Sequence, residues 1–261
     1  MLYLKLNGSL GDHVMATGIP EAYFEIYKEP TFVETEFKIL FKNNPYITDN
    51  FFNVTKEYSL KFNEYPKDYM IYYPVRIFYD ITGIIADRNL VRPRLYKKRT
   101  YLPQKTAIVN DQAGWPSRVG YKYFNDLVIK LKANNFVVWY IRNQKSLNCF
   151  GQPSPEVITD YTHKAFNIPL EELIDRLSEC DLYIGYDSGV SQLAGALDVP
   201  YVMLSGSVPP INTAHNSCIY TLDLLCDRCC KELCEKSCLS YSENKNDEII
   251  EIINKRVKRD D

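Results

Sequence analysis

The sequence lacks any long apolar run. None of its 261 residues belongs to a stretch of about 18 consecutive apolar residues, the minimum for a membrane-spanning helix. The first twelve residues, MLYLKLNGSLGD, have no cationic start, and polar Asn7 and Gly8 interrupt their apolar run, which argues against a secretory signal peptide. The composition, 46% hydrophobic and 25% charged, is typical of a globular protein. We therefore expect a soluble, cytoplasmic protein that does not span a membrane.

Charge of one sign is not in large excess either. The formal net charge is -2, whereas a general affinity for nucleic-acid phosphates needs a clustered basic surplus. We therefore expect no nucleic-acid partner. One basic cluster, RNLVRPRLYKKR at residues 88–99, is open to two interpretations, a solvated connector or a binding surface. Such charge runs favour the connector.

Histidine is scarce. The chain has three histidines, His13, His163 and His215, and the last two fall in predicted loops. For each of them a solvated or hydrogen-bonded structural role is favoured. We therefore assign no catalytic histidine.

Strand-like and helical stretches alternate along the first part of the chain. An apolar run at residues 2–6 ends at Asn7-Gly8, and residues 14–26 then have helical spacing that Pro30 stops. Further strands are predicted at 37–41, 51–54 and 69–73, and a helix at 75–85. These elements predict a first domain over residues 1–102.

The second part repeats the alternation with clearer signals. Strands are predicted at residues 106–109, 136–141, 182–184 and 199–204, and helices at 121–133, 170–177, 190–197 and near the C-terminus. Alternating strands and helices favour parallel sheets, because parallel neighbours need a crossover connection. We predict an α/β protein of two small doubly wound domains, 1–102 and 103–261, that face each other across a cleft.

The motif GSLGD, Gly8 to Asp12, lies between the first predicted strand and helix. Open α/β sheets bind ligands at the carboxyl ends of strands, and glycines let the backbone approach them. The motif lacks the three glycines of a dinucleotide fingerprint and the Gly-Lys-Ser/Thr of a phosphate loop. Asp12 either belongs to a binding site or simply caps a helix that begins near His13.

The stretch YIGYDSGVSQLAGALDV, from Tyr183 to Val199, places an Asp-Ser-Gly turn between a strand and a short helix. Backbone amides at a helix start can hold phosphate oxygens, helped by the helix dipole. Ser188 and Gly189 are therefore candidates for a phosphate cradle. A carboxylate repels a diphosphate, so Asp187 either faces a sugar hydroxyl or caps the helix.

The ordered set of motifs resembles glycosyltransferase family nine, the heptosyltransferase family. LGDHVMATG at residues 10–18 is similar to that family's N-terminal Gly-Asp motif, KILFKNNPYITDNFFNV to its second and third strands, and QAGWPSRVGYKYFNDLVIKL to the start of its donor domain. The strongest similarity is CDLYIGYDSGVSQLAGALDVPYVMLSGSVPP at residues 180–210. The resemblance implies the two-domain GT-B fold.

This resemblance also implies a reaction. Family members transfer a sugar from a nucleotide-diphosphate donor, here a heptose or another sugar, to an acceptor hydroxyl. Asp12 aligns with the family's proposed general base, which can accelerate transfer about 100-fold to 10,000-fold. The resemblance implies that the acceptor hydroxyl attacks opposite the departing diphosphate and so inverts the anomeric centre. Gly11, His13 and Thr17 share its loop on the acceptor side. The acceptor is a glycan, a lipid-linked molecule or a protein, and a non-catalytic nucleotide- or sugar-binding module is the alternative function.

The donor side follows from the same resemblance. It assigns donor or phosphate contacts to five residues: Arg118, Asp187, Ser188, Gly189 and Gln192. Arg118 stands where the family usually has lysine, with a surface role as the alternative. Two departures stand out, because Gln192 replaces a common histidine and Gly18 a proline. The nucleobase is expected near residues 166–170, where Phe166 either contacts it or belongs to the core.

Cysteines cluster late in the chain. Cys226, Cys229, Cys234 and Cys238 have the spacing C-x2-C-x4-C-x3-C, with Cys230 left over. Four thiolates can form a tetrahedral zinc or iron site, and plain thiols are the alternative. A closed four-cysteine site leaves no position for a substrate, so we expect a structural metal and no catalytic one.

Overall fold

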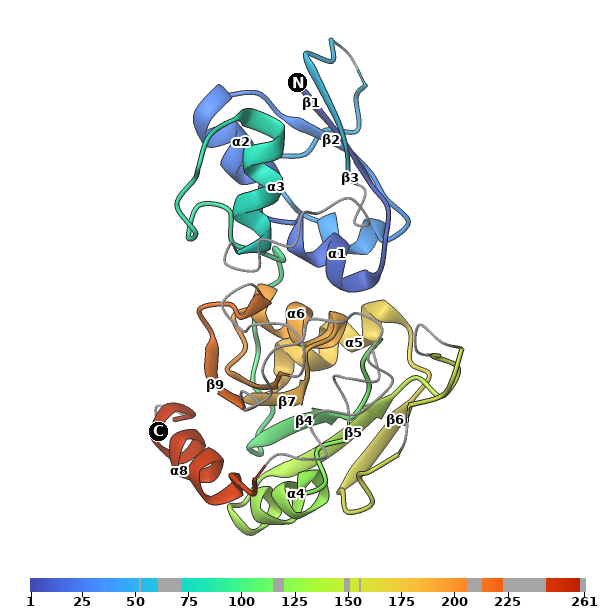
Figure 1. Cartoon of the computed structure of the whole chain (residues 1–261), viewed down its shortest axis with the longest axis vertical. Coiled ribbons are helices and arrows are strands. Elements are labelled where there is room, and N and C mark those ends of the chain that lie inside the picture. The colour runs from blue at the N-terminus through green and yellow to red at the C-terminus, as the bar shows by residue number, and fades with distance from the viewer. Residues whose placement is uncertain are drawn as a thin grey trace.

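The computed structural model describes residues 1–51, 53–60, 72–114, 120–147, 151–154, 156–205, 213–222 and 243–258. Two separate parallel sheets, each with its helices, lie one above the other in Figure 1. The predicted α/β class with two parallel sheets is confirmed. No helix in these described ranges combines the length and the apolar character that a bilayer crossing requires.

The upper part, which we call the N-terminal lobe, is built on a three-stranded sheet with the order β2-β1-β3. Its elements are β1 (Leu2–Leu6), α1 (Leu10–Met15), α2 (Ile19–Tyr27), β2 (Thr31–Glu34), the 3₁₀ helix η1 (Lys38–Phe41), β3 (Lys56–Leu60) and α3 (Tyr73–Thr82). Leu2, Leu4 and Leu6 alternate with half-buried residues, so β1 buries one face of its side chains. That face packs against the apolar sides of α1, α2 and α3.

Several sequence predictions in this lobe are wrong. Residues 37–41 form η1 and not a strand, and β2 and β3 lie at 31–34 and 56–60, outside the predicted ranges. Both strands are short and half-polar, because only one face of this sheet is buried. The helix predicted at 14–26 is divided into α1 and α2 by residues 16–18. Of the strand predicted at 69–73, residues 69–71 lie outside the described residues, and Tyr73 begins α3.

The lower part, the C-terminal lobe, contains a six-stranded parallel sheet with the order β6-β5-β4-β7-β8-β9. The strands are β4 (Thr106–Asn110), β5 (Val137–Arg142), β6 (His163–Phe166), β7 (Leu182–Tyr186), β8 (Tyr201–Leu204) and β9 (Cys218–Leu222). The order reverses between β4 and β7, which is the switch point where doubly wound sheets bind ligands. β4, β5, β7 and β8 confirm predictions, whereas β6 and β9 were not expected, and His163 lies on a strand.

Helices cover both faces of this sheet, as predicted for parallel strands. α5 (Leu170–Glu179) and α6 (Gly189–Ala196) pack on the face that is continuous with the core of the N-terminal lobe. α4 (Phe124–Ala133) and α8 (Asn246–Arg256) cover the opposite face, at the lower edge of Figure 1. One apolar core therefore runs across the seam between the lobes.

The basic segment at residues 88–99, here called the connector, binds to both lobes. Arg92 pairs with Asp198 at 3.0 Å, Arg94 pairs with Glu21, and Lys97 with Asp175. Arg99 donates to the backbone carbonyl of Cys180 at 2.7 Å. These cations are partnered within the protein, which agrees with the connector interpretation and not with a binding surface. The boundary near residue 103 stays a prediction.

Candidate functional site

The two predicted binding loops meet at the seam between the lobes. The loop after β1 leads into α1, the turn after β7 leads into α6, and α1 lies directly above α6 in Figure 1. The approach is close, because a Cβ on Gly11 would lie 3.5 Å from the Cα of Gly189. Both loops follow the carboxyl end of a central strand, at the switch point of their sheets. The candidate site is therefore assembled from both lobes.

Asp12 lies at the third position of α1, and the helix begins at Leu10 rather than near His13. Its Oδ2 accepts hydrogen bonds from the Ser9 backbone amide at 2.7 Å and from the Ser9 hydroxyl at 2.8 Å. The bond from the Ser9 amide to the Asp12 side chain is one half of a capping box, in which the Ser9 side chain also faces the backbone amide of Asp12, and this box orders the first turn of the helix. Asp12 thus has a fixed position in the first turn of α1, the helix that packs against α6 of the other lobe.

The Asp-Ser-Gly turn forms the start of α6. Ser188 is the N-cap in extended conformation, and its backbone amide donates to the Ser191 hydroxyl at 3.0 Å. Asp187 is buried, and its Oδ1 accepts a hydrogen bond from the side-chain amide of Gln192 at 3.1 Å. The turn therefore has the predicted strand–cap–helix geometry, with Asp187 turned inward to Gln192.

Gln192 continues into a buried polar chain. Its Oε1 lies 2.6 Å from Nε2 of His215, and Nδ1 of His215 lies 2.8 Å from the hydroxyl of Tyr72. Burial, together with the positive charges of Arg88 and Arg92, lowers the pKa of His215 to about 3. His215 is therefore neutral at physiological pH and has the hydrogen-bonded structural role expected from its sequence.

The buried His215 predicts acid-sensitive folding. Between about pH 6.5 and pH 3 the unfolded chain binds a proton on this imidazole that the folded protein does not bind. The free energy of unfolding therefore falls as the pH decreases through this window, by up to about 1.4 kcal/mol per pH unit for this group. Urea denaturation from pH 7 to pH 4 measures the slope of the unfolding free energy against pH. His215→Gln should reduce this slope by the contribution of about one bound proton. The exposed His163→Gln serves as the control, and equal slopes in all three proteins would contradict the assignment.

The two other residues predicted for the acceptor loop lie inside the N-terminal lobe. His13 is fully buried, with Nδ1 2.7 Å from the Thr35 hydroxyl and its ring edge-on to Phe37, and burial lowers its pKa. The Thr17 hydroxyl accepts a hydrogen bond from the Arg94 amide at 2.9 Å. His13 therefore packs behind the loop, and Thr17 anchors the connector.

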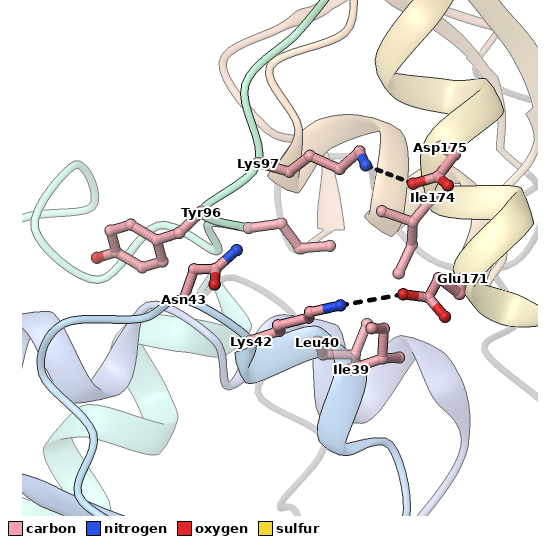
Figure 2. Close-up of a pocket in the computed structure, with 10 residues that line it drawn as sticks. Ile39, Leu40, Lys42, Asn43, Tyr96, Lys97, Glu171, Ile174 and Asp175 are labelled. Carbon is pink, nitrogen blue, oxygen red and sulfur yellow. Dashed lines mark hydrogen bonds and ion pairs between the residues drawn. The ribbon is translucent and has the colours of Figure 1, made fainter.

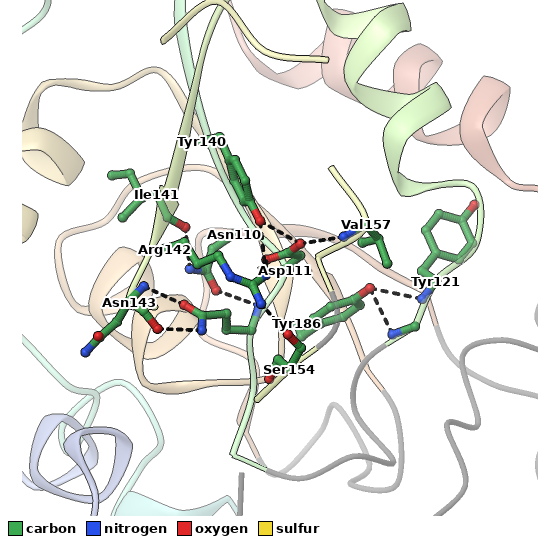
Figure 3. A network of polar contacts seen from close by, with 12 residues as sticks. Asn110, Asp111, Tyr121, Tyr140, Ile141, Arg142, Asn143, Ser154, Val157 and Tyr186 are labelled. Atoms are coloured by element: carbon green, nitrogen blue, oxygen red, sulfur yellow. Dashed lines mark hydrogen bonds and ion pairs between the residues drawn. The ribbon is translucent and has the colours of Figure 1, made fainter. Parts of the chain in front are cut away.

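A second polar network lies at the carboxyl ends of β4 and β5 (Figure 3). Asp111 accepts hydrogen bonds from Arg142 at 2.6 Å, from the Tyr140 hydroxyl at 2.8 Å and from the Val157 amide at 2.9 Å. Arg142 also donates to the Ser154 carbonyl. Asp111 and Arg142 are both buried, so each compensates the desolvated charge of the other. The network holds Ser154 and Val157 against the sheet.

Tyr186 anchors a neighbouring loop to the Asp-Ser-Gly turn. Its hydroxyl accepts hydrogen bonds from the amides of Gly120 and Tyr121, each at 3.0 Å, and it directly precedes Asp187 in the chain. Arg118, two residues before Gly120, lies outside the described residues. Phe166 packs edge-on against Tyr140, 5.3 Å between ring centroids, as a partly buried part of the core.

The predicted metal ligands also lie outside the described residues. Cys226, Cys229, Cys234 and Cys238 fall within residues 223–242. Among the residues that the structure does describe, no group of three or more His, Cys, Asp or Glu side chains could hold a metal ion.

A cavity of about 90 Å³ lies in the seam between η1, the connector and α5. Figure 2 shows two ion pairs across it, Lys42 with Glu171 at 3.1 Å and Lys97 with Asp175. Ligand pockets for small molecules usually measure about 300 to 1,000 Å³. This cavity is therefore a gap between the ion-paired lobes and not a donor pocket.

The sequence did not predict that four residues of these networks belong to the site: Tyr72, Asp111, Tyr140 and Arg142. The position of Asp111 was one available signal, because it directly follows a predicted central strand, where ligands of parallel sheets bind. Tyr72 had no such signal, because its partner His215 is 143 residues away in the chain.

Comparison with known proteins places these features in context. The family model described as Glycosyltransferase family 9 (heptosyltransferase) matches residues 100–240, more than half of the chain. A search of curated proteins finds no match.

Solved structures of other proteins are similar to this one. A glycosyltransferase family 9 protein from Veillonella parvula DSM 2008 has 12% identity and a TM-score of 0.71, covering 98% of this chain and 97% of the other. E. coli ADP-heptose lps heptosyltransferase II has 13% identity and a TM-score of 0.62, covering 98% of each chain. The iron-containing dodecameric glycosyltransferase TibC from enterotoxigenic E. coli H10407 has 17% identity and a TM-score of 0.63, covering 82% of this chain. This chain spans only 62% of TibC. At these identities the similarity concerns the fold, and it confirms the predicted GT-B-like architecture.

Proposed function

The chain belongs to glycosyltransferase family 9, and from that membership we propose that it transfers a sugar from a nucleotide-diphosphate donor to an acceptor hydroxyl. The observation that carries the proposal is the meeting of the Asp12 loop with the Asp-Ser-Gly turn. A general base on one lobe then faces a helix start on the other, with both at switch points of parallel sheets.

Each side of the seam has its own part in the reaction. The first amides of α6, after Ser188, bind the diphosphate, because a helix start combines unpaired N–H groups with a favourable dipole. The acceptor oxygen forms a bond to the anomeric carbon while the bond from that carbon to the diphosphate oxygen breaks. The diphosphate leaves with the electron pair, the proton passes to Asp12, and the anomeric centre inverts. Arg118 neutralises charge on the leaving group.

The donor is proposed to be a nucleotide sugar, with a heptose as the first candidate. Support comes from the similar structures, since TibC has been solved with ADP-D-beta-D-heptose. The acceptor is a glycan, a lipid-linked molecule or a protein. For the four clustered cysteines a structural zinc or iron ion stays the proposal, which the iron content of TibC supports. Localisation in the cytoplasm stays a prediction.

Ligand-induced stabilisation tests this proposal. The melting temperature is measured with ADP, GDP and UDP and with their sugar conjugates. A ligand at 100 times its dissociation constant stabilises the folded state by about 2.7 kcal/mol. We expect one nucleotide to raise the melting temperature clearly above the others. No stabilisation by any nucleotide diphosphate or nucleotide sugar would contradict the proposal.

Gly189→Val should weaken donor binding. A Cβ at Gly189 would lie 3.1 Å from the amide nitrogen of Gly11 and equally close to the side chain of Leu10. The branched side chain therefore pushes the start of α6 from α1 and crowds the amides that bind phosphate. We expect the dissociation constant of the best nucleoside diphosphate to rise at least about tenfold, with a stability loss of about 1 to 3 kcal/mol.

Calorimetric titration measures the affinity, at a temperature where urea denaturation shows the variant to be folded. Gly189→Ala, with a single methyl group, should have an intermediate affinity. An unchanged dissociation constant in the folded valine variant would refute the phosphate cradle.

A further inference from the structure

One buried hydrogen-bonded chain joins the N-terminal lobe to the Asp-Ser-Gly turn. It runs from Tyr72, the N-cap of α3, through His215 and Gln192 to Asp187. All four residues are at most 6% exposed. Buried polar chains of this kind are stable only when every group has its partner, so their geometry is strongly specified.

The direction of every hydrogen bond in the chain is determined. The carboxylate of Asp187 can only accept, so the Gln192 amide nitrogen donates to it and the Gln192 oxygen must point to His215. His215 therefore donates from Nε2. Since the imidazole is neutral, Nδ1 is its acceptor, and the Tyr72 hydroxyl donates to Nδ1. A single tautomer and a single amide orientation satisfy the whole chain.

The surroundings hold the His215 ring in place. Its backbone amide donates to the Tyr201 hydroxyl at 2.8 Å, and the ring packs on Gly195 so tightly that a Cβ there would overlap it. On the other side the Arg88 guanidinium stacks on the Tyr72 ring at 4.0 Å. Arg88 also donates to the carbonyl of Ala214, next to His215. The contact between Tyr72 and His215 is thus fixed from both lobes.

We propose that His215 is a positioning residue, which transmits the contact with Tyr72 of the N-terminal lobe through Gln192 to the Asp187 turn and so orders the donor site. The link to donor binding rests on the proposed function, whereas the physical coupling does not. Gln192 is then more than a replacement for an imidazole at its position. Its amide joins an imidazole from a distant segment to the turn.

Hydrogen exchange of the ligand-free protein tests the coupling. Tyr72→Phe removes only the hydroxyl that donates to His215. Loss of one buried hydrogen bond should raise amide exchange in peptides covering residues 186–193, in the opposite lobe, about fivefold. Tyr79→Phe on α3 makes the same chemical change at an exposed position and should leave those peptides unchanged. Equal exchange in Tyr72→Phe and wild type would overturn the proposal.

Two substitutions of His215 provide a second test. Glutamine can present an amide N–H toward Gln192, whereas leucine cannot. His215→Gln should therefore keep amide exchange in residues 186–193 close to the slow wild-type rate, and His215→Leu should raise it. Equal exchange rates in the two variants would show that the hydrogen bond to Gln192 does not matter and would overturn the positioning role.

Nucleotide titration then separates this inference from the proposed function. In Tyr72→Phe we expect a three- to tenfold rise in the dissociation constant and in the donor KM, with kcat changed less than twofold. If wild type binds no nucleotide, the proposed function fails while the exchange data still decide the coupling. If wild type binds a nucleotide and Tyr72→Phe binds it equally well, the coupling to the donor site is refuted and the proposed function stands.

Discussion

Asp12→Asn is expected to lower kcat for sugar transfer by about 100-fold to 10,000-fold, the usual contribution of a positioned general base. The amide cannot accept the proton of the acceptor hydroxyl. Its oxygen can still accept the hydrogen bonds that Ser9 donates to Oδ2, so α1 should keep its first turn. Nucleoside diphosphate affinity should stay within a few-fold of wild type.

The comparison with Ser9→Ala separates catalysis from capping. This variant removes the hydroxyl that donates to Asp12 at 2.8 Å and leaves the carboxylate in place. Loss of such a capping contact costs about 1 kcal/mol of stability, and transfer should fall far less than in Asp12→Asn. Unchanged turnover in folded Asp12→Asn would leave Asp12 with its capping role alone.

Gly18→Ala is expected to destabilise the protein by about 3 kcal/mol or more, at the upper end of overpacking effects. A Cβ at this position would overlap the carbonyl oxygen of Arg92 and lie 2.6 Å from that of Val91. The connector cannot simply move away, because the Leu95 amide is bound to the Ala196 carbonyl at 2.9 Å and Arg92 to Asp198. Urea denaturation measures the loss.

Gly114→Ala is the matched control for this prediction, since a Cβ there would meet no atom of the described residues within 4 Å. Its stability should stay close to that of wild type. A Gly18→Ala variant as stable as Gly114→Ala would contradict the packing seen at the connector. The close approach also accounts for a glycine where the resemblance predicts a proline, because any side chain would displace the connector.

The sequence predicted the C-terminal lobe well because its signals are local. β4, β7 and β8 are apolar runs buried on both faces, β5 starts as an apolar run buried at alternate positions, and the strongly amphipathic α5 precedes β7. The Asp-Ser-Gly turn follows such a run directly, so its place at the switch point could be predicted. The apolar pattern of each of these elements by itself indicates which of its faces are buried.

The N-terminal lobe was harder for a physical reason. β2 and β3, with the sequences TFVE and KEYSL, are short and expose one face, so they lack a continuous apolar run. The apolar residues at 39–41 instead turn inward within η1, where Leu40 and Phe41 are buried. At the break between α1 and α2, Gly18 meets the connector, a contact between residues more than 70 positions apart that the sequence alone does not show.

The polar networks were the least predictable part. Gln192 stood out only as a departure from the family pattern, and its partner His215 is 23 residues further along the chain. The basic connector had two interpretations, because a sequence shows the cations of residues 88–99 but not the carboxylates that pair with them. Only the folded chain brings Asp175, Asp198 and Glu21 to these cations.

Donor turnover is the most direct test of the central claim. The purified protein is incubated with the nucleotide sugar that stabilises it most, with water in place of the acceptor hydroxyl, and the nucleoside diphosphate released by this hydrolysis is measured beside Asp12→Asn. We predict steady release by wild type and at least about 100-fold slower release by the variant. Tight binding of the nucleotide sugar without release from any donor would contradict the account and identify the chain as a non-catalytic binding module.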